Sequence, residues 1–183
     1  MKVLLKFSNV TLERGGKTLF EDLDVELGPG ERLQVAGPNG SGKSSLIRLA
    51  AGLLQAARGQ VDRAPLALAD DHLALDRELL LRNALGFWGG AVEQAMVALH
   101  IDHLAEVPVR LLSSGQLKRA TLARVAASRA PLWLLDEPLN GLDTDGRKRL
   151  GGAVERHLEG GGAVLAASHQ QLGGDWRRLE LGR

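Results

Sequence analysis

A glycine-rich segment with one lysine has the residue types needed to bind the phosphates of a nucleotide. In the stretch GPNGSGKSS, residues Gly37, Gly42, Lys43 and Ser44 have the Gly-x4-Gly-Lys-Ser spacing of a Walker A motif. Glycines let backbone N–H groups turn toward an anion. We expect Lys43 to reach the β- and γ-phosphates and the Ser44 hydroxyl to ligate Mg²⁺. The residues expected to contact nucleotide here are Gly37, Pro38, Asn39, Gly40, Ser41, Gly42, Lys43, Ser44 and Ser45.

Two adjacent carboxylates follow an apolar run further along the chain. Residues 132–135 read LWLL and precede Asp136 and Glu137, as in a Walker B strand. A carboxylate at the end of a buried strand can hold Mg²⁺, and we assign this role to Asp136. Glu137 would then act on the water that attacks the γ-phosphate, as general base or by positioning it. The alternative, an acidic pair that only ends a strand, is disfavoured by the Walker A motif upstream.

A third segment, residues 112–116, reads LSSGQ and could form a second anion site. The Ser113 hydroxyl, the Gly115 backbone and the N-terminus of the following helix would supply the donors. Taken alone, SSGQ is an ordinary helix-capping sequence. Its position before Asp136-Glu137 favours the functional interpretation.

Together the three motifs resemble those of the nucleotide-binding subunits of ABC transporters, whose signature sequence is LSGGQ, and the resemblance covers essentially the whole chain. It implies that residues 140–143 form the D-loop, with Asp143 as its aspartate, and that His169 senses the γ-phosphate. It also implies a head-to-tail dimer, in which the signature of one subunit closes on ATP bound to Lys43 of the other. The signature residues expected to contact nucleotide are Ser113, Ser114, Gly115 and Gln116. The catalytic residues implied are Lys43, Glu137 and His169.

Within this family the stretches GPNGSGKSSLIRLAAGL, WLLDEP and AASHQQLG are most similar to ATPase subunits of the bacterial haem exporters of cytochrome c maturation. The likeness implies hydrolysis of MgATP that drives export of haem, or of a component needed for c-type cytochromes. It further implies integral membrane transporter subunits as partners and a peripheral location on the cytoplasmic face of the bacterial inner membrane. The alternatives are an ABC exporter for another substrate and a soluble ABC-type ATPase of translation or DNA repair. A P-loop kinase is disfavoured by LSSGQ and by Glu137.

Three positions depart from the family pattern. The aromatic residue that stacks on adenine is replaced by Arg14, whose guanidinium plane can also stack on a base. The loop expected near residues 69–72 has no Gln for Mg²⁺. Asp71 or His72 could substitute for it, and the alternative is a solvated acidic turn. Ser114 replaces a signature glycine and reduces backbone freedom. We therefore expect slow basal hydrolysis.

Composition narrows the remaining possibilities. The chain has 183 residues, with 23 Lys and Arg against 22 Asp and Glu, and a net charge of +1. This near balance argues against a nucleic-acid partner. There is no cysteine, which excludes disulfides and thiol catalysis. No apolar run is long enough for a membrane-spanning helix.

The order of elements fits one ABC ATPase domain over residues 1–183. The implied fold class is α/β: a P-loop NTPase with a RecA-like mixed sheet core, an N-terminal antiparallel β subdomain and a small helical insert near residues 76–128. The predicted strands cover residues 2–7, 19–27, 32–36, 132–135 and, as the last strand, 163–167. Helices are predicted after Gly42 to about Gly52, over 116–128 with its basic residues mostly outward, and from Thr144 as N-cap to about Gly160.

Overall fold

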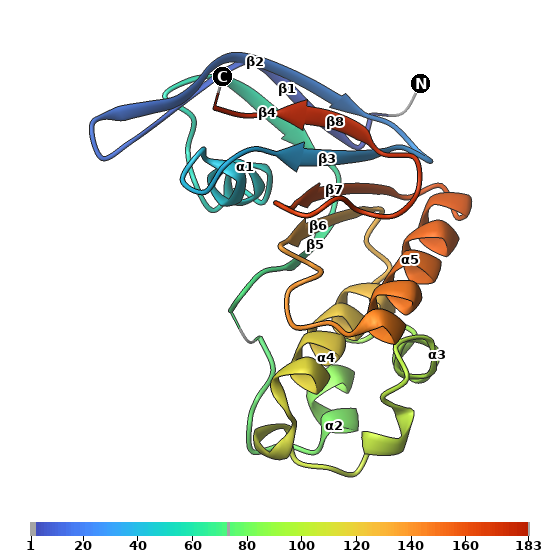
Figure 1. The fold of residues 1–183 in the computed structure, drawn as a ribbon. Helices are drawn as coiled ribbons and strands as arrows, with labels where there is room; N and C mark the ends of the chain where they lie inside the picture. The colour runs from blue at the N-terminus through green and yellow to red at the C-terminus, as the bar shows by residue number, and fades with distance from the viewer. Residues whose placement is uncertain (1–2, 73, 183) are drawn as a thin grey trace.

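The computed structural model of the chain describes residues 3–72 and 74–182, and its strands form two sheets (Figure 1). The smaller sheet is antiparallel, in the order β2-β1-β4, and consists of β1 (Leu5–Arg14), β2 (Lys17–Leu27) and β4 (Arg58–Arg63). Gly15 and Gly16 form the β1–β2 turn with φ values of 57° and 72°, which a two-residue hairpin turn requires. The turn therefore places Arg14 at the end of a long hairpin.

The larger sheet has five strands in the order β5-β6-β7-β3-β8. These strands are β5 (Leu66–Ala69), β6 (Leu132–Asp136), β7 (Ala163–Ala167), β3 (Arg32–Ala36) and β8 (Arg177–Glu180). All their ladders are parallel, so the α/β fold class is as predicted but the expectation of a mixed core sheet was wrong. The reason is topological. The connections bring the chain back to the end of the sheet at which the previous strand began, so neighbouring strands run in the same direction, and the antiparallel pairing is confined to the other sheet.

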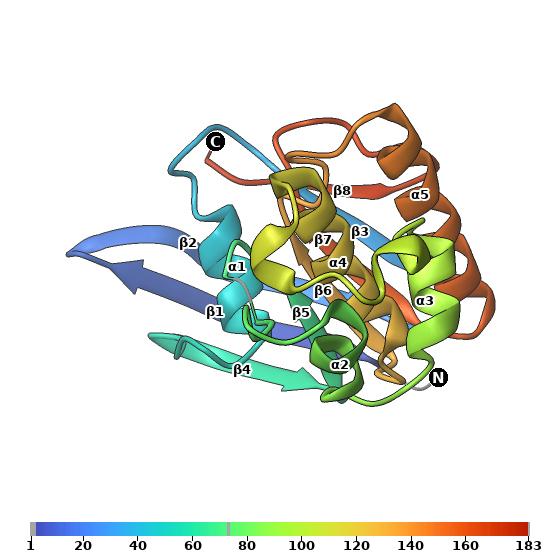
Figure 2. The same ribbon diagram turned by 90° about the horizontal axis from the view of Figure 1, so that it is seen from below.

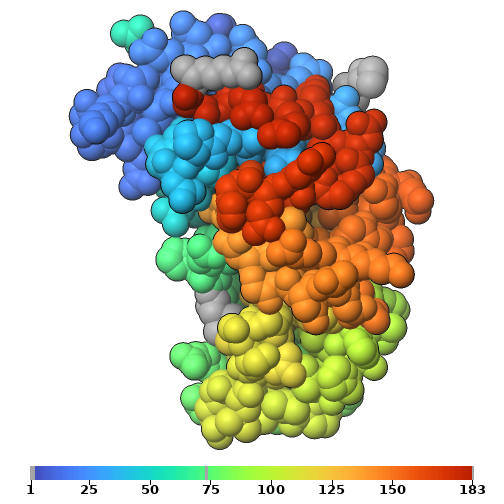
Figure 3. Space-filling model, viewed as in Figure 1, coloured from blue at the N-terminus to red at the C-terminus, as the bar shows by residue number. Residues whose placement is uncertain are grey.

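The helices lie on both faces of the parallel sheet. They are α1 (Lys43–Ala50), α2 (Leu81–Gly86), α3 (Val92–Ala98), α4 (Ser114–Ala127) and α5 (Thr144–Glu159), with short 3₁₀ turns at Asp102–Leu104 and Val109–Leu111. Seen from below, α3 and α4 lie in front of the parallel strands, and α1 lies toward the β1–β2 hairpin (Figure 2). The space-filling view shows the helical part at one end of the molecule and the N-terminal strands at the other (Figure 3).

The parallel sheet separates two hydrophobic cores, and β6 contributes to both. Trp133 and Leu135 pack into the core shared with α3, α4 and α5. Leu132 and Leu134 pack into the core shared with α1 and the antiparallel sheet. This alternation is the side-chain period of two that a strand imposes, and all five residues of β6 are buried. The strand that ends at Asp136 is therefore fixed from both faces.

Several predicted elements match and others do not. The strands over 32–36 and 163–167 have the predicted bounds. The first strand begins at Leu5 rather than at Lys2, which lies outside the described residues, and the second begins at Lys17. The helix after Lys43 ends at Ala50.

Two expectations were wrong. Asp143, not Thr144, is the N-cap of α5, because its carboxylate accepts a hydrogen bond from the Gly146 N–H at 2.8 Å. Residues 163–167 are not the last strand, because β8 follows, and β4 and β5 were not predicted either. β4 and β8 are edge strands with mostly exposed polar residues, and the four residues of β5 are all apolar, so none of these sequences alternates apolar with polar residues.

Candidate active site

The glycine-rich loop connects the end of β3 to the start of α1, and its conformation requires glycine at two places. Gly37 has a φ of 143°, and a Cβ there would lie 2.5 Å from the Leu181 carbonyl oxygen. Gly42 has a φ of 100°, and a Cβ there would lie 3.2 Å from the Cβ of Leu19. Both positions combine a left-handed backbone with close neighbours, so a side chain at either would distort the loop.

Lys43 and Ser41 give this loop its polar interior. The ammonium of Lys43 donates hydrogen bonds of 2.9 Å to the carbonyl oxygens of Gly37 and Pro38, and the side chain is buried. The buried Oγ of Ser41 has no hydrogen-bond partner among the described residues. A buried hydroxyl without a partner is rare in a folded protein. The loop therefore has spare polar capacity, which fits the binding of phosphate oxygens.

Ser44 and Asp136 lie side by side at the mouth of the loop. The Ser44 hydroxyl donates to the Asp136 carboxylate at 3.0 Å. Burial raises the pKa of the Asp136 carboxyl above its ordinary value of 3.8, while the hydrogen bond from Ser44 opposes this shift. A hydroxyl and a carboxylate are hard oxygen donors of the kind that Mg²⁺ prefers together with phosphates and water. The residues present therefore fit this ion.

Glu137 and His169 form the second polar pair of the site. The Nδ1 of His169 lies 2.8 Å from the Oε2 of Glu137. Glu137 has a φ of 44°, uncommon for a residue with a side chain, and its N–H donates to the Ala167 carbonyl at 2.8 Å. The Glu137 backbone is thus fixed by the end of β7, and His169 lies two residues beyond that end. The end of one strand therefore positions both side chains.

These groups line a common cleft of about 590 Å³. From the predicted set the cleft collects Arg14, Asn39, Gly40, Gly42, Lys43, Ser44, Ser45, Glu137 and His169. Asp136 adjoins it through its bond to Ser44. Asn140, the first residue of the predicted D-loop, also lines the cleft, as does Leu19, which was not among the predicted site residues. Leu19 has no chemical signature, and its contribution becomes visible only once the β1–β2 hairpin is folded.

The signature residues lie in a different hollow, of about 390 Å³, and do not line the phosphate cleft. The lining of this separate hollow includes Ser113, Gly115, Gln116 and Asp143. Ser113 and Gln116 form a capping box: Gln116 N–H donates to Ser113 Oγ at 3.3 Å, and Ser113 N–H donates to Gln116 Oε1 at 2.8 Å. Ser114 is the first residue of α4. Within one chain, then, the predicted nucleotide contacts form two separate groups.

Arg119 holds the signature and D-loop segments together. Its guanidinium donates to Asp143 at 2.6 Å and to Asp145 at 3.0 Å. The arginine side chain is only 12% exposed. The hydrogen bond from the Gly146 N–H and the one from Arg119 lower the pKa of Asp143 below its ordinary value. The spacing of the apolar residues predicted that the basic side chains of this helix point mostly outward, so Arg119 was not among the predicted site residues.

Lys118 is the second basic side chain of α4 that points inward. Burial lowers its pKa, although the nearby charges of Asp71, Asp136 and Glu137 oppose that change. Its ammonium donates to the Asp136 carbonyl oxygen at 3.5 Å. A lysine of the helical layer therefore faces the acidic side of the cleft, contrary to the prediction for this helix.

Asp71 lies in an exposed turn after β5. Its negative charge contributes to the raised pKa of Asp136, so the two carboxylates are near each other. His72 is also exposed, and its N–H donates to Asp70 Oδ1 at 3.1 Å. No three His, Asp or Glu side chains in the described ranges 3–72 and 74–182 converge on one point as a metal site would require. A cation at this site would therefore be held by the oxygens of Ser44 and Asp136 and by those of a bound nucleotide.

Comparison with known proteins gives the family. The ABC transporter family model matches residues 20–140. The chain belongs to the ABC transporter family. Among its ABC relatives, the cytochrome c biogenesis ATP-binding export protein CcmA of Sphingopyxis alaskensis is 52% identical, over 94% of this chain and 93% of the relative. The protein of the same name from Novosphingobium aromaticivorans is 51% identical, over 90% and 88% of the two chains.

Solved structures agree on the ABC ATPase fold. An ABC transporter ATP-binding protein from Pyrococcus furiosus has a TM-score of 0.83 at 19% identity, covering 97% of this chain and 96% of that one. The ATP-binding subunit of another ABC transporter has a TM-score of 0.82 at 21% identity, covering 91% and 79%. The predicted family, fold class and ABC-type ATPase activity are therefore confirmed. In the described part of the chain, no helix is long and apolar enough to span a bilayer.

Proposed function

We propose that this chain is the ATP-hydrolysing subunit of an exporter that serves the biogenesis of c-type cytochromes, with haem or a component needed for haem delivery as cargo. The support comes from relatives of 51–52% identity over nearly their whole length, which carry the name of such an export protein. The structural observation that carries the chemistry is the Glu137–His169 pair, which lines the same cleft as Lys43 and Ser44. The 1–183 segment would act as one ABC ATPase domain.

The phosphate loop is proposed to bind ATP, with Lys43 exchanging its two carbonyl partners for phosphate oxygens. Ser44 and Asp136 are proposed to hold Mg²⁺ beside these phosphates, with Asp71 near enough to contribute through water. A bound Mg²⁺ neutralises developing charge on the β- and γ-phosphates. Asp136 would bind the ion as a carboxylate. The positive charge of the ion would then lower the pKa of Asp136 and oppose the effect of burial, which raises it.

Glu137 is proposed to orient and polarise the attacking water, and His169 to hold the Glu137 carboxylate in place. With Glu137 Oε2 bound to His169 Nδ1, the other carboxylate oxygen can accept from water. Catalysis of this kind consists of positioning and charge stabilisation, because phosphoryl transfer to water needs no covalent intermediate with the protein.

The signature residues and Asp143 are proposed to act on ATP bound by a second copy of the chain. Ser113 and Gly115 lie in a hollow that shares no lining residue with the phosphate cleft, so one chain holds two incomplete halves. A head-to-tail dimer would bring the signature residues of each chain to the phosphate cleft of the other. Integral membrane subunits are proposed as the further partners, which would place the chain peripherally on the cytoplasmic face of the bacterial inner membrane.

The test is complementation in a bacterium that makes c-type cytochromes and lacks its own copy of this gene. The wild-type chain should restore covalently bound haem in c-type cytochromes, and Glu137→Gln should not. Variant chains must accumulate to equal levels. b-type cytochromes, which hold haem without covalent attachment, are the control and should be unaffected. Normal c-type cytochromes in the deletion strain would contradict the proposed cargo, even if the purified protein hydrolyses ATP.

A further inference from the structure

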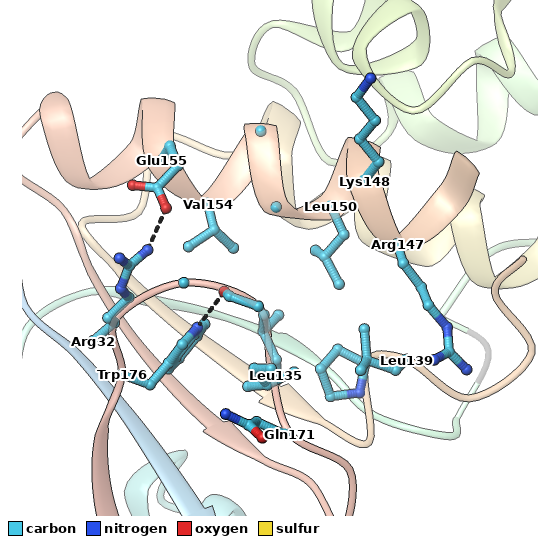
Figure 4. A pocket seen from close by; sticks show the side chains of 16 residues that line it. Arg32, Leu135, Leu139, Arg147, Lys148, Leu150, Val154, Glu155, Gln171 and Trp176 are labelled. Atoms are coloured by element: carbon cyan, nitrogen blue, oxygen red, sulfur yellow. Dashed lines mark hydrogen bonds and ion pairs between the residues drawn. The ribbon is translucent and has the colours of Figure 1, made fainter. Parts of the chain in front are cut away.

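A third cavity, of about 440 Å³, lies between α5 and the segments that follow Glu137 and His169 (Figure 4). It shares no lining residue with the nucleotide cleft. Its apolar side chains include Leu135, Leu139, Leu150, Val154, Leu172 and Trp176. Small-molecule sites are cavities of roughly 300 to 1,000 Å³ with mainly apolar walls and a few polar groups. This cavity has that size and character.

Gly151 is an exposed residue of α5 that lines the cavity. It shares a helix face with Arg147 and Val154, four residues before it and three after it, which line the same cavity. A Cβ at this position would meet no atom within 4 Å, so packing does not require glycine. Its φ is not positive either, and a glycine inside a helix costs about 1 kcal/mol relative to alanine. The missing side chain leaves the space next to this part of the cavity wall open.

The charged rim of the cavity favours an anion. Three cationic side chains and one carboxylate line it: Arg32, Arg147, Lys148 and Glu155. Arg32 pairs with Glu155, and Lys148 points away from the cavity (Figure 4). Arg147 donates through Nε to the Leu142 carbonyl oxygen at 3.2 Å and has no carboxylate partner among the described residues. Arg147 is exposed, so its guanidinium is available to an anion at the rim of the apolar cavity.

We propose that this cavity binds a small soluble molecule with an apolar body and one anionic group. The apolar body fills the space over Gly151 against Leu150 and Val154, and the anionic group pairs with Arg147. Leu139 and Leu172 belong to the segments that continue directly from Glu137 and from His169. A ligand held between them changes the free energy of the Glu137–His169 arrangement, so its binding and ATP hydrolysis are thermodynamically coupled.

The test uses 1-anilinonaphthalene-8-sulfonate, an apolar anion whose fluorescence rises on binding, and the wild-type chain without nucleotide. We expect saturable binding with quenching of Trp176 emission, and at least a tenfold loss of affinity in Gly151→Leu, whose side chain fills the cavity. Gly86→Leu is the matched control, because Gly86 is also helical, has open space around its Cβ and lies outside the cavity. Unchanged affinity in Gly151→Leu, or no binding by the wild type, would overturn the site.

Arg147→Gln tests the anion preference without filling the cavity. It should weaken binding of the sulfonate probe at least fivefold and leave binding of the neutral N-phenyl-1-naphthylamine unchanged. Equal effects on both probes would overturn the role of the charge. At saturation the sulfonate probe should change the ATP hydrolysis rate of the wild type at least twofold and leave that of Gly151→Leu unchanged, and an unaffected wild-type rate would overturn the coupling. Probe binding without nucleotide is independent of hydrolysis, so a failure here is distinguishable from a failure of the proposed function.

Discussion

The Nδ1 of His169 lies 2.8 Å from the Oε2 of Glu137, although 32 positions separate the two residues in the chain. The contact exists because β6 and β7 are adjacent parallel strands, so the residues that follow them emerge at the same edge of the sheet. The Glu137 backbone is also bound to Ala167, the last residue of β7. The geometry of the carboxylate thus depends on two strands rather than on one loop.

Replacing Glu137 by Gln should leave ATP binding within about twofold of wild type and reduce hydrolysis at least a hundredfold. The amide keeps the size of the carboxylate but lacks its basicity, and general base or positioning roles contribute on the order of 10²–10⁴ in rate. Phosphate release and equilibrium nucleotide binding, measured on the same preparation, would check this. Undiminished hydrolysis would remove Glu137 from the mechanism.

Replacing Lys43 by Ala should abolish ATP binding, because the only cationic side chain among the residues that form the phosphate loop would be lost. Lys43→Arg is the matched control: it keeps the charge but not the compact ammonium that now donates to Gly37 and Pro38. We expect affinity to fall at least a hundredfold in the alanine variant and less in the arginine variant, as measured by calorimetric titration with ATP. Affinity retained in Lys43→Ala would refute the phosphate-binding role of the loop.

Asp136→Asn should stabilise the protein at neutral pH, and its hydrolysis should require a higher Mg²⁺ concentration, because one proposed ligand of the ion is lost. Because burial raises the folded-state pKa of Asp136, the folded chain holds this proton more tightly than the unfolded chain. The stability of the wild type relative to Asp136→Asn should therefore be constant below pH 3.8, fall as pH rises through the window between 3.8 and the raised pKa, and level off above it.

The size of that fall is about 1.4 kcal/mol for each unit by which the pKa is raised. Urea unfolding of both proteins at a series of pH values, without Mg²⁺, would measure it. The lowered pKa values of other carboxylates cancel in the difference between the two proteins. A stability difference independent of pH would contradict the buried, partly desolvated state of Asp136.

Lys118→Met should shift the pH dependence of hydrolysis to higher pH without a large loss of stability. The lysine ammonium donates to the Asp136 carbonyl oxygen, so removing its positive charge should raise the pKa of the Asp136 carboxyl further above its ordinary value. Met retains the length and apolar stem of the side chain. A pH–rate profile measured for both proteins would check the shift, and Lys118→Arg should preserve the wild-type profile. An unshifted profile in Lys118→Met would show that the lysine has only a packing role.

Arg14→Ala should weaken binding of ATP and of GTP by a similar factor, of about fivefold or more, corresponding to the loss of a stacking contact of about 1–3 kcal/mol. Arg14 lines the nucleotide cleft from the end of the β1–β2 hairpin, next to Leu19. Leu19→Ala is a useful comparison, because it removes apolar contact without changing charge. Nucleotide affinity unchanged in Arg14→Ala would exclude the residue from the site.

Features that depend on residues close together in the sequence could be predicted, and features that depend on residues far apart in the sequence could not. The phosphate loop, the strand that ends at Asp136 and the capping box at Ser113 depend on neighbouring residues, so short motifs are sufficient to identify them. The inward positions of Lys118 and Arg119 depend on carboxylates brought by β5, β6 and the D-loop, which helical periodicity does not contain. The edge strands β4 and β8 have mostly exposed polar residues, so they can be recognised as strands only once their pairing with β1 and with β3 is known.

The place of β3 in the sheet has a consequence for biosynthesis. β3 leads directly into the phosphate loop, yet its two neighbours are β7 and β8, the last strands along the chain. While the chain emerges from the ribosome, both edges of β3 stay unpaired until residues 163–180 have been made. Pairings of such long sequence separation form slowly. The nascent chain should therefore gain its affinity for ATP only after residues 163–180 have been made, and the exposed edges of β3 make the interval before that the time of greatest aggregation risk.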